Sequence, residues 1–443
     1  MALELEEEVV ALRAEVAALR EALAQAQARI AELERRKTPP PAFVGANTPT
    51  ERPATPRRKR AAAHNAGRPR EEPTQIVYHA EERCPDCGYL LRGQSVARTR
   101  QVIDLPEPAP VEITEHRLLK RHCPACDRWW TPRVDFSGQV LGQGRFGVRL
   151  VSLIAYLRQS ARLPLATIQH VLATVHGLHL SVGALVDVLH RLGRATQAEQ
   201  DALLAQARAS PVLHMDETGW RENGQNGYVW GLVTPGAQPV CYYAYDRSRA
   251  GAVAATLLAD FSGHLVTDYY CAYNHLGCQH QRCWIHLLRD LHALKQAHAT
   301  DAAVVQWAQA VRALYDDAQA AFDGPRVLPA ALRALLARQL EAQAYRLAVR
   351  YAGQKKHPCQ ALAKRLLRHM GELFAFVRVD GLDADNNRAE RLLRPVVVQR
   401  KISGGTRSAA GSATRLGLAS LFQTWHARGL NPFQQCLALL HSQ

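Results

Sequence analysis

The sequence predicts a multidomain α+β protein in which a strand-rich core lies between helical segments. Residues 212–286 alternate short strand-like runs with Gly, Asn and Pro turns. Long stretches on both sides have helical character, and the N-terminal part carries a heptad pattern and two Cys-x-x-Cys pairs. With 443 residues and 47% hydrophobic content, the chain can form two or three domains with buried cores and is not a disordered protein.

The charge of the chain favours a polyanionic partner. The formal net charge is +15 and the pI is near 9.6, which fits nucleic acid first, although a ribosome-associated or anionic-membrane protein has the same balance. The N-terminus is acidic and helical, unlike a signal peptide, and no apolar run reaches the roughly 18 residues that span a bilayer. We therefore expect a cytoplasmic protein whose ten cysteines are reduced.

Residues 1–37 predict a parallel coiled coil that forms a homodimer or a higher oligomer. Apolar residues alternate in steps of four and three, with β-branched side chains at most a positions. The proposed g-to-e pairs have opposite charges: Glu8 with Arg13, Glu15 with Arg20, and Arg29 with Glu34. A single amphipathic helix that packs on its own chain is the alternative. The a positions are Val9, Val16, Leu23 and Ile30, and the d positions are Leu5, Leu12, Leu19, Ala26 and Leu33.

Residues 38–76 predict a flexible basic linker, because prolines and two basic runs cannot form a core. Its Gly-Arg-Pro-Arg run is similar to arms that insert an arginine into the minor groove, with a solvated linker as the alternative. The DNA-binding candidates of this segment are Arg57, Arg58, Lys59, Arg60, Arg68 and Arg70.

Residues 77–135 predict a zinc ribbon with one structural Zn²⁺. Two Cys-x-x-Cys knuckles are separated by a strand-like stretch, and four thiolates would leave no open coordination position. A redox-active pair is the competing reading, but it lacks a thioredoxin-like βαβ setting. The ligands would be Cys84, Cys87, Cys123 and Cys126.

Residues 140–210 predict a helical domain that could bind DNA. Leu163 and Pro164 open one helix, Gly177 makes a turn, and Ser181 caps a second helix. This is a helix-turn-helix spacing, and an ordinary helical hairpin fits it equally well.

Residues 211–286 predict the first part of a ribonuclease H-like core. Asp216 would lie on the central first strand and Asp268 at the end of the fourth, adjacent in space. Residues 287–380 predict a helical insertion before the final segment, 381–443. The expected strands are 212–216, 228–234, 240–245, 264–268 and a short one near Cys283, with a helix over 250–258.

The most informative run is Asp-Asn-Asn-Arg-Ala-Glu-Arg-Leu-Leu-Arg-Pro at 385–395. Asp385 or Asn386 can cap a helix in which Glu390 lies one turn inside, among Arg388, Arg391 and Arg394, with Pro395 ending it. Two strand acids and one helix acid, Asp216, Asp268 and Glu390, suggest a two-metal site for phosphoryl transfer.

Three sequence words resemble the transposases of the insertion-sequence 66 family. They are Met-Asp-Glu-Thr at 215–218, Cys-Trp-Ile-His at 283–286, and Asn-Asn-Arg-Ala-Glu-Arg-Leu-Leu-Arg-Pro at 386–395. The resemblance extends over nearly the whole chain. The sequence around Asp268 departs from the family pattern at one position. It reads Asp268-Tyr269-Tyr270, where the family usually has Asp-Gly-Tyr.

The resemblance implies that the three acids hold two Mg²⁺ or Mn²⁺ ions, about 3.5–4 Å apart. Water would cut double-stranded DNA at the element ends, and the freed 3′ hydroxyl would attack target DNA. The resemblance also implies a bacterial, nucleoid-associated protein, with accessory proteins encoded beside it as candidate partners. Cys283 and His286 would favour a softer metal, so we expect them to support the site rather than bind magnesium. An RNase H-like nuclease or resolvase is the enzymatic alternative. A zinc-containing DNA-binding regulator is the non-enzymatic one.

Residues near the acids have alternative roles. Glu217 is expected on the opposite face of the strand from Asp216, in a non-catalytic role. His214 shares the face of Asp216 and would contact substrate or fill the core, whereas Trp220 is expected to pack rather than stack on a base. Candidate phosphate clamps, with a solvated helix face as the alternative, are Arg391, Arg394, Arg400, Lys401 and Arg407.

Overall fold

The computed structural model describes residues 17, 21, 23–25, 27, 28, 72–93, 95, 96, 98–105, 111–322 and 328–442. Within the predicted coiled coil, the described residues, all between 17 and 28, are helical. The rest of the coiled coil, and the basic linker up to residue 71, lie outside the described residues. The chain divides into two units, Met1–Leu105 and Pro106–Gln443. Each unit is considered by itself.

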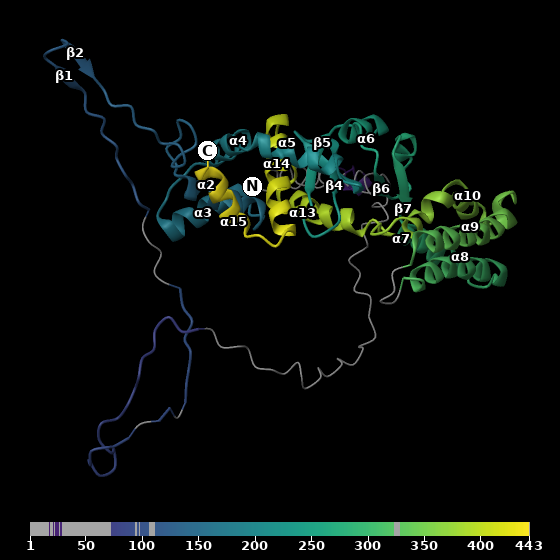
Figure 1. The fold of residues 1–443 in the computed structure, drawn as a ribbon, viewed down its shortest axis with the longest axis horizontal. Helices are drawn as coiled ribbons and strands as arrows, with labels where there is room; N and C mark the ends of the chain where they lie inside the picture. Colours follow the sequence, from purple (N-terminus) through teal and green to yellow (C-terminus); the bar gives the residue numbers. More distant parts are fainter. Residues whose placement is uncertain are drawn as a thin grey trace, which may run out of the picture. The chain divides into compact units, whose positions relative to one another are not determined.

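Short hairpins carry both Cys-x-x-Cys pairs. In the first unit, Arg83 and Leu90 form an isolated antiparallel bridge around the first pair. In the second unit, strands β1 (Arg121–Cys123) and β2 (Arg128–Trp130) pair antiparallel around the second (Figure 1). The strand-like stretch predicted between the two pairs is wrong for the residues that the structure describes, because none of those between Leu90 and Arg121 forms a strand.

The helical domain contains the predicted pair of helices. Gly177 ends α3 in the left-handed conformation at φ 63°, which glycine adopts without a Cβ clash. Ser181 begins α4, and its Oγ accepts a hydrogen bond from the Ala184 N–H at 3.1 Å. The domain consists of α2 (Val148–Gln159), α3 (Leu165–His176), α4 (Val182–Ala195) and α5 (Gln197–Arg208).

A five-stranded mixed sheet forms the centre of the second unit. Its order is β5-β4-β3-β6-β7, with β3, β4 and β5 antiparallel and β6 and β7 parallel to β3. All five predicted strands are present, and β3 is longer than expected because its hairpin with β4 pairs as far as Glu222 and Gln225. The elements are β3 (Val212–Glu222), β4 (Gln225–Val233), β5 (Cys241–Asp246), α6 (Gly251–Leu258), β6 (His264–Thr267), the 3₁₀ helix η2 (Cys271–His275) and β7 (Gln279–Arg282).

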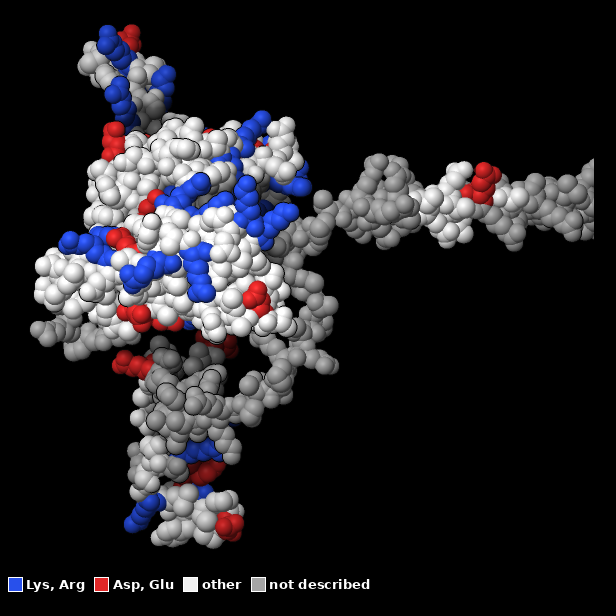
Figure 2. Space-filling model, turned by 90° about the vertical axis from the view of Figure 1, so that its right-hand side faces the viewer, with Lys and Arg blue, Asp and Glu red and all other residues white. Residues whose placement is uncertain are grey.

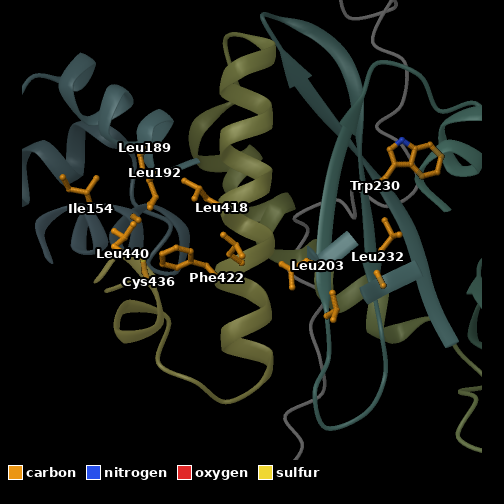
Figure 3. Close-up of a cluster of buried hydrophobic side chains, with 14 of the residues drawn as sticks. Ile154, Leu189, Leu192, Leu203, Trp230, Leu232, Leu418, Phe422, Cys436 and Leu440 are labelled. Atoms are coloured by element: carbon orange, nitrogen blue, oxygen red, sulfur yellow. The ribbon is translucent and has the colours of Figure 1, made fainter. Parts of the chain in front are cut away.

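The central strand β3 contributes to different cores on its two faces. Leu213 and Met215 belong to a core that the sheet shares with the helical domain and the C-terminal helices. Figure 3 shows this core, with Trp230 and Leu232 from β4 and Phe422 from α14. Trp220 lies on the other face, in a smaller core with the helix that carries Glu390. Consequently, His214 and Asp216 share the face of that helix.

The predicted helical insertion follows β7 and has its own core. Trp307, Leu340 and Phe374 are among its buried residues, and Trp284 at its start is fully buried. Its helices are α7 (Trp284–Ala297), α8 (Ala302–Ala320), α9 (Ala330–Ala352), α10 (Gln360–Arg368), α11 (Met370–Leu373) and α12 (Ala375–Arg378). In Figure 1 they extend beyond the β7 edge of the sheet.

Helix α13 does not end at Pro395, so that prediction is wrong. The helix continues to Ser403 and ends at Gly404, which has φ 71°. Pro395 lacks only one backbone donor, and Val396 and Gln399 beyond it are buried, so packing holds the helix together. The C-terminal helices are α13 (Asn387–Ser403), α14 (Ala409–Ala427) and α15 (Pro432–His441).

Helix α14 covers the edge of the sheet. The backbone N–H groups of Cys241 and Tyr243 on β5 donate to the hydroxyls of Thr424 and Ser420, each at 2.9 Å. The outer strand is thereby capped rather than left open for pairing.

The long helices of the described residues are amphipathic rather than wholly apolar. Helix α9 has 23 residues but includes several arginines, among them Arg346 and Arg350. No helix in the described part of the chain has the length and apolar character that a membrane span requires.

Candidate active site

The fold brings Asp216, Asp268 and Glu390 to one region. Asp216 lies on β3, Asp268 directly follows β6, and these two strands are parallel neighbours. Glu390 lies in the first turn of α13, which packs against β3 and β4. Strand order alone predicted that Asp216 and Asp268 lie close together. The packing of α13 against the sheet brings Glu390 to them.

The electrostatics of Asp216 reflect this arrangement. Burial raises the pKa of Asp216 well above its ordinary value, and the neighbouring charges of Glu217, Asp268 and Glu390 raise it further. Burial and three neighbouring carboxylates therefore both disfavour the charged form of Asp216. A cation is the chemical species that such a site favours.

One carboxylate oxygen of each strand acid is bound to a backbone amide. Asp216 Oδ1 accepts from the Glu217 N–H at 2.9 Å, and Asp268 Oδ1 accepts from the Tyr270 N–H at 2.8 Å. Glu390 Oε1 is buried without a hydrogen-bond partner. Across the described residues, no three His, Cys, Asp or Glu side chains are close enough together to coordinate a metal ion as they stand.

The expected ring of arginines around Glu390 is wrong. Arg388 forms an ion pair with Asp383 instead. The basic side chain beside Glu390 is that of His286, whose Nε2 lies 3.7 Å from Glu390 Oε1. Arg391 and Arg394 are exposed on the following turn of α13.

Asn386 connects the start of α13 to the strand that carries Asp216. Its fully buried side chain donates from Nδ2 to the Met215 carbonyl at 2.9 Å, and its Oδ1 lies 3.3 Å from His214 Nδ1. Its own N–H donates to Cys283 Sγ at 3.2 Å. Of the two predicted caps, Asp385 makes the contact, since its Oδ1 accepts from the Asn387 N–H at 2.9 Å. Sequence reasoning therefore missed the linking role of Asn386.

His214 is a core histidine with polar partners. It is fully buried, and its Nε2 lies 3.2 Å from Asp383 Oδ2. Burial alone would raise the pKa of Asp383, but hydrogen bonds from His214 and Arg388 lower it to about 2. His214 thus contacts the segment that precedes α13.

Gly231 allows α13 to approach the sheet closely. It lies opposite Asp216 in the β3–β4 ladder. A Cβ atom at this position would lie 2.9 Å from the Leu393 Cδ2 of α13. The absence of a side chain at Gly231 therefore helps to set the distance between the helix of Glu390 and the strand of Asp216.

The Cys-Trp-Ile-His word begins α7 beside the acids. Burial raises the pKa of Cys283 to about 11, so its sulfur is a neutral thiol near pH 7. It accepts the Asn386 N–H, while Trp284 fills the core of the insertion. These contacts agree with the predicted supporting role, although they leave that role a prediction.

Arg282 holds the backbone at Asp268. The side chain is almost fully buried and donates to the Asp268 carbonyl at 3.0 Å and to Thr267 Oγ1 at 3.1 Å. It also forms an ion pair with Glu372 of the insertion. A single arginine at the end of a short strand gives no sequence signal for such a role, so it was not predicted.

Glu217 and Trp220 have structural contacts. Glu217 is buried, its Oε1 accepts two hydrogen bonds from Arg249, and its Oε2 accepts one from Tyr273. Trp220 is buried and donates from Nε1 to Thr406 Oγ1 at 3.1 Å. Both agree with the non-catalytic roles expected for them.

The predicted phosphate clamps on and after α13 fall into two groups. Arg400 is half-buried and donates to the Gly219 carbonyl, so it helps to fasten α13 to β3. The others are exposed, as a contact with DNA requires: Arg391, Arg394, Lys401 and Arg407.

The two Cys-x-x-Cys pairs form similar turns, each within its own unit. The pKa of Cys84 is lowered by backbone hydrogen bonds from Cys87 and Asp86. The pKa of Cys123 is lowered by hydrogen bonds from Cys126, with a smaller contribution from the Ala125 backbone. In both turns, backbone N–H groups favour the thiolate form that binds metal.

Comparisons with known proteins agree with the geometry. Two uncharacterized proteins of Sinorhizobium fredii (strain NBRC 101917 / NGR234) are similar to the chain. One, y4qI, is 26% identical over 316 residues, which cover 64% of this chain and 57% of the relative. The other, y4jD, is 26% identical over 412 residues, which cover 85% of this chain and 78% of the relative.

Two family models match the chain. Residues 81–127 match the zinc-finger binding domain of transposase IS66 and thus include all four cysteines of the two pairs. Residues 143–414, more than half of the chain, match the model described as Transposase IS66 family and include the three acids. The chain belongs to the IS66 family of transposases.

Proposed function

We propose that the chain is a DDE-type transposase that binds the ends of an insertion sequence, cleaves the DNA and joins the 3′ ends to target DNA. The observation that carries the proposal is the meeting of Asp216, Asp268 and Glu390 where β3, β6 and α13 adjoin. The sheet order, three antiparallel strands followed by two parallel ones, supports an RNase H-like core.

The donor set of this site suits Mg²⁺ or Mn²⁺. Three carboxylates provide hard oxygen ligands, and the neighbouring carboxylates add to the effect of burial in raising the pKa of Asp216. Two bound cations would activate the attacking oxygen and stabilise the departing 3′ oxygen. Glu390 Oε1 accepts no hydrogen bond and lies 3.7 Å from His286 Nε2, which leaves it a candidate ligand.

The remaining residues position the acids and the DNA. Asn386 fixes the start of α13 against Met215, and Arg282 fixes the backbone of Asp268. Arg394 lies one turn after Glu390 on the same face of α13, so it can contact a phosphate that enters the site.

The N-terminal segments would organise the complex. Cys84, Cys87, Cys123 and Cys126 would bind one structural Zn²⁺, whose binding energy would fold the module. The heptad pattern of residues 1–37 would join two chains in parallel and bring two active sites to two DNA ends.

A strand-transfer assay tests the proposed function. Purified protein is incubated with Mg²⁺, a labelled duplex that carries the terminal inverted repeat found beside the coding region, and a target plasmid. Joined products support a transposase. Cleavage without joining would indicate a nuclease or resolvase, and binding without cleavage would indicate a regulator.

A further inference from the structure

The insertion has one strongly basic segment. Residues 330–368, which include α9 and α10, contain nine Lys and Arg residues and one acid, Glu341. Helix α8 is different, since it contains one arginine and two acids. Charge is therefore distributed unevenly within this small bundle.

Besides Arg338, which donates to the Ala334 carbonyl, six of the nine basic side chains are exposed and lack acidic partners. We call them the α9–α10 basic surface. Among the described residues, no ion pair joins one of these six side chains to an acid. The surface consists of Arg346, Arg350, Lys355, Lys356, Lys364 and Arg368.

Three acids of the insertion pair with basic side chains outside this surface. Asp290 pairs with Arg365, Glu341 with Arg378, and Asp380 with Arg333. A surface helix that only needs to be solvated commonly alternates charges, as Arg312 and Asp316 do on α8. The basic surface has no such balance. Figure 2 views the molecule from the side on which the insertion lies in Figure 1, and Lys and Arg side chains gather there.

The insertion is connected directly to the candidate active site. Helix α7 begins at Trp284, and His286 in its first turn lies beside Glu390. The helix has 14 residues and leads to the rest of the bundle, a distance of about 20 Å at 1.5 Å per residue. That distance corresponds to about six base pairs of duplex DNA.

We propose that the α9–α10 basic surface binds the phosphate backbone of duplex DNA flanking the position of cleavage. Duplex DNA carries one negative charge per about 1.7 Å of its axis, so several phosphates can meet the surface at once. The choice of DNA as the partner rests on the proposed function. The surface belongs to the helical bundle whose first helix, α7, begins beside Glu390, where DNA would react.

The test is the salt dependence of DNA binding by the full-length, zinc-loaded protein. Fluorescence anisotropy measures its affinity for a labelled duplex of about 30 base pairs without Mg²⁺. The variant Arg346→Gln, Arg350→Gln, Lys364→Gln and Arg368→Gln removes four charges. We expect the slope of log affinity against log salt to become shallower by about 0.9 per lost contact, roughly 3 to 4 in total.

Two controls separate charge from folding. Arg346→Lys, Arg350→Lys, Lys364→Arg and Arg368→Lys keeps all four charges and should keep the wild-type slope. Arg312→Gln removes one paired charge from α8 and should change the slope by less than one unit. A slope that stays at the wild-type value in the four-Gln variant would overturn the proposal, and so would an equal loss in the charge-conserving variant.

Hydroxyl-radical footprinting locates the contact. The four-Gln variant should lose protection on the flank and keep it at the terminal repeat. Because both measurements record binding without catalysis, they give a result even if the wild-type protein neither cleaves nor joins DNA. Failure of strand transfer would count against the proposed function alone, whereas unchanged binding would count against this surface alone.

Discussion

The Asn386 side-chain amide donates to the Met215 carbonyl at 2.9 Å, which joins the start of the helix of Glu390 to the residue before Asp216. This contact is fully buried. A single hydrogen bond thus joins the segments that carry Asp216 and Glu390, which are 174 positions apart in the numbering.

Asn386→Ala should destabilise the fold and misplace Glu390. It leaves buried polar groups without a partner, which costs about 1–3 kcal/mol. We expect a lower denaturation midpoint and a cleavage rate that falls more than DNA affinity. Asn226→Ala, at an exposed position of β4, is the control and should change neither. Normal cleavage by a stable Asn386→Ala protein would remove the positioning role.

Asp216→Asn should stabilise the metal-free protein at pH 7. The pKa of Asp216 is raised in the fold, so its stabilising contribution is present at low pH and lost as the pH rises. The substitution removes this buried charge, and we expect a melting temperature a few degrees higher, about 1 kcal/mol. Differential scanning fluorimetry should show the difference shrinking near pH 4 and on addition of Mg²⁺. A lower melting temperature at pH 7 would contradict the account.

Glu372→Gln should reduce the acid sensitivity of the protein. Burial alone would raise the pKa of Glu372, but hydrogen bonds from His369 and Arg282 lower it to about 2. Because this pKa is depressed, the contribution to stability is present above about pH 4.5 and is lost as the pH falls toward 2. Urea titrations across that range should show a flatter pH dependence for the variant. An unchanged pH dependence would mean that Glu372 does not form a charged ion pair with Arg282.

Zinc should bind through the four predicted cysteines with one ion per chain. Replacement of Cys84 or Cys123 by Ser should release the metal and unfold the module, since apparent site energies of about 10–16 kcal/mol include its folding. Cys271→Ser is the control, because Cys271 is a free, exposed cysteine outside the two pairs. Elemental analysis of the purified variants makes the comparison. Zinc retained by both Cys84→Ser and Cys123→Ser would refute the ligand set.

Local patterns predicted the elements well, because their causes are local. Alternating apolar residues and turn-forming Asn-Gly and Pro-Gly pairs mark the strands from β3 to β5, and Ser181 marks the start of α4. The position of Asp268 after β6 also followed from strand order. These features depend on residues that are close together in the chain.

The contacts behind the site could not be predicted in the same way. Arg282 and Asn386 act through partners far away in sequence, and no spacing rule identifies such partners. The helix α13 passes Pro395 because burial on both sides of it outweighs one missing hydrogen bond, a tertiary effect that local propensity does not contain.

The central claim is that Asp216, Asp268 and Glu390 form one catalytic site. The direct measurement is Mg²⁺-dependent cleavage of a terminal-repeat duplex by Asp216→Asn, Asp268→Asn and Glu390→Gln, with DNA binding measured in parallel without Mg²⁺. Asp260→Asn, which changes an exposed acid before β6, is the control. We expect each site variant to lose at least about a thousandfold in rate, some 4 kcal/mol, with unchanged binding, and the control to cleave normally. Near-normal cleavage by any one of the three site variants would contradict the claim.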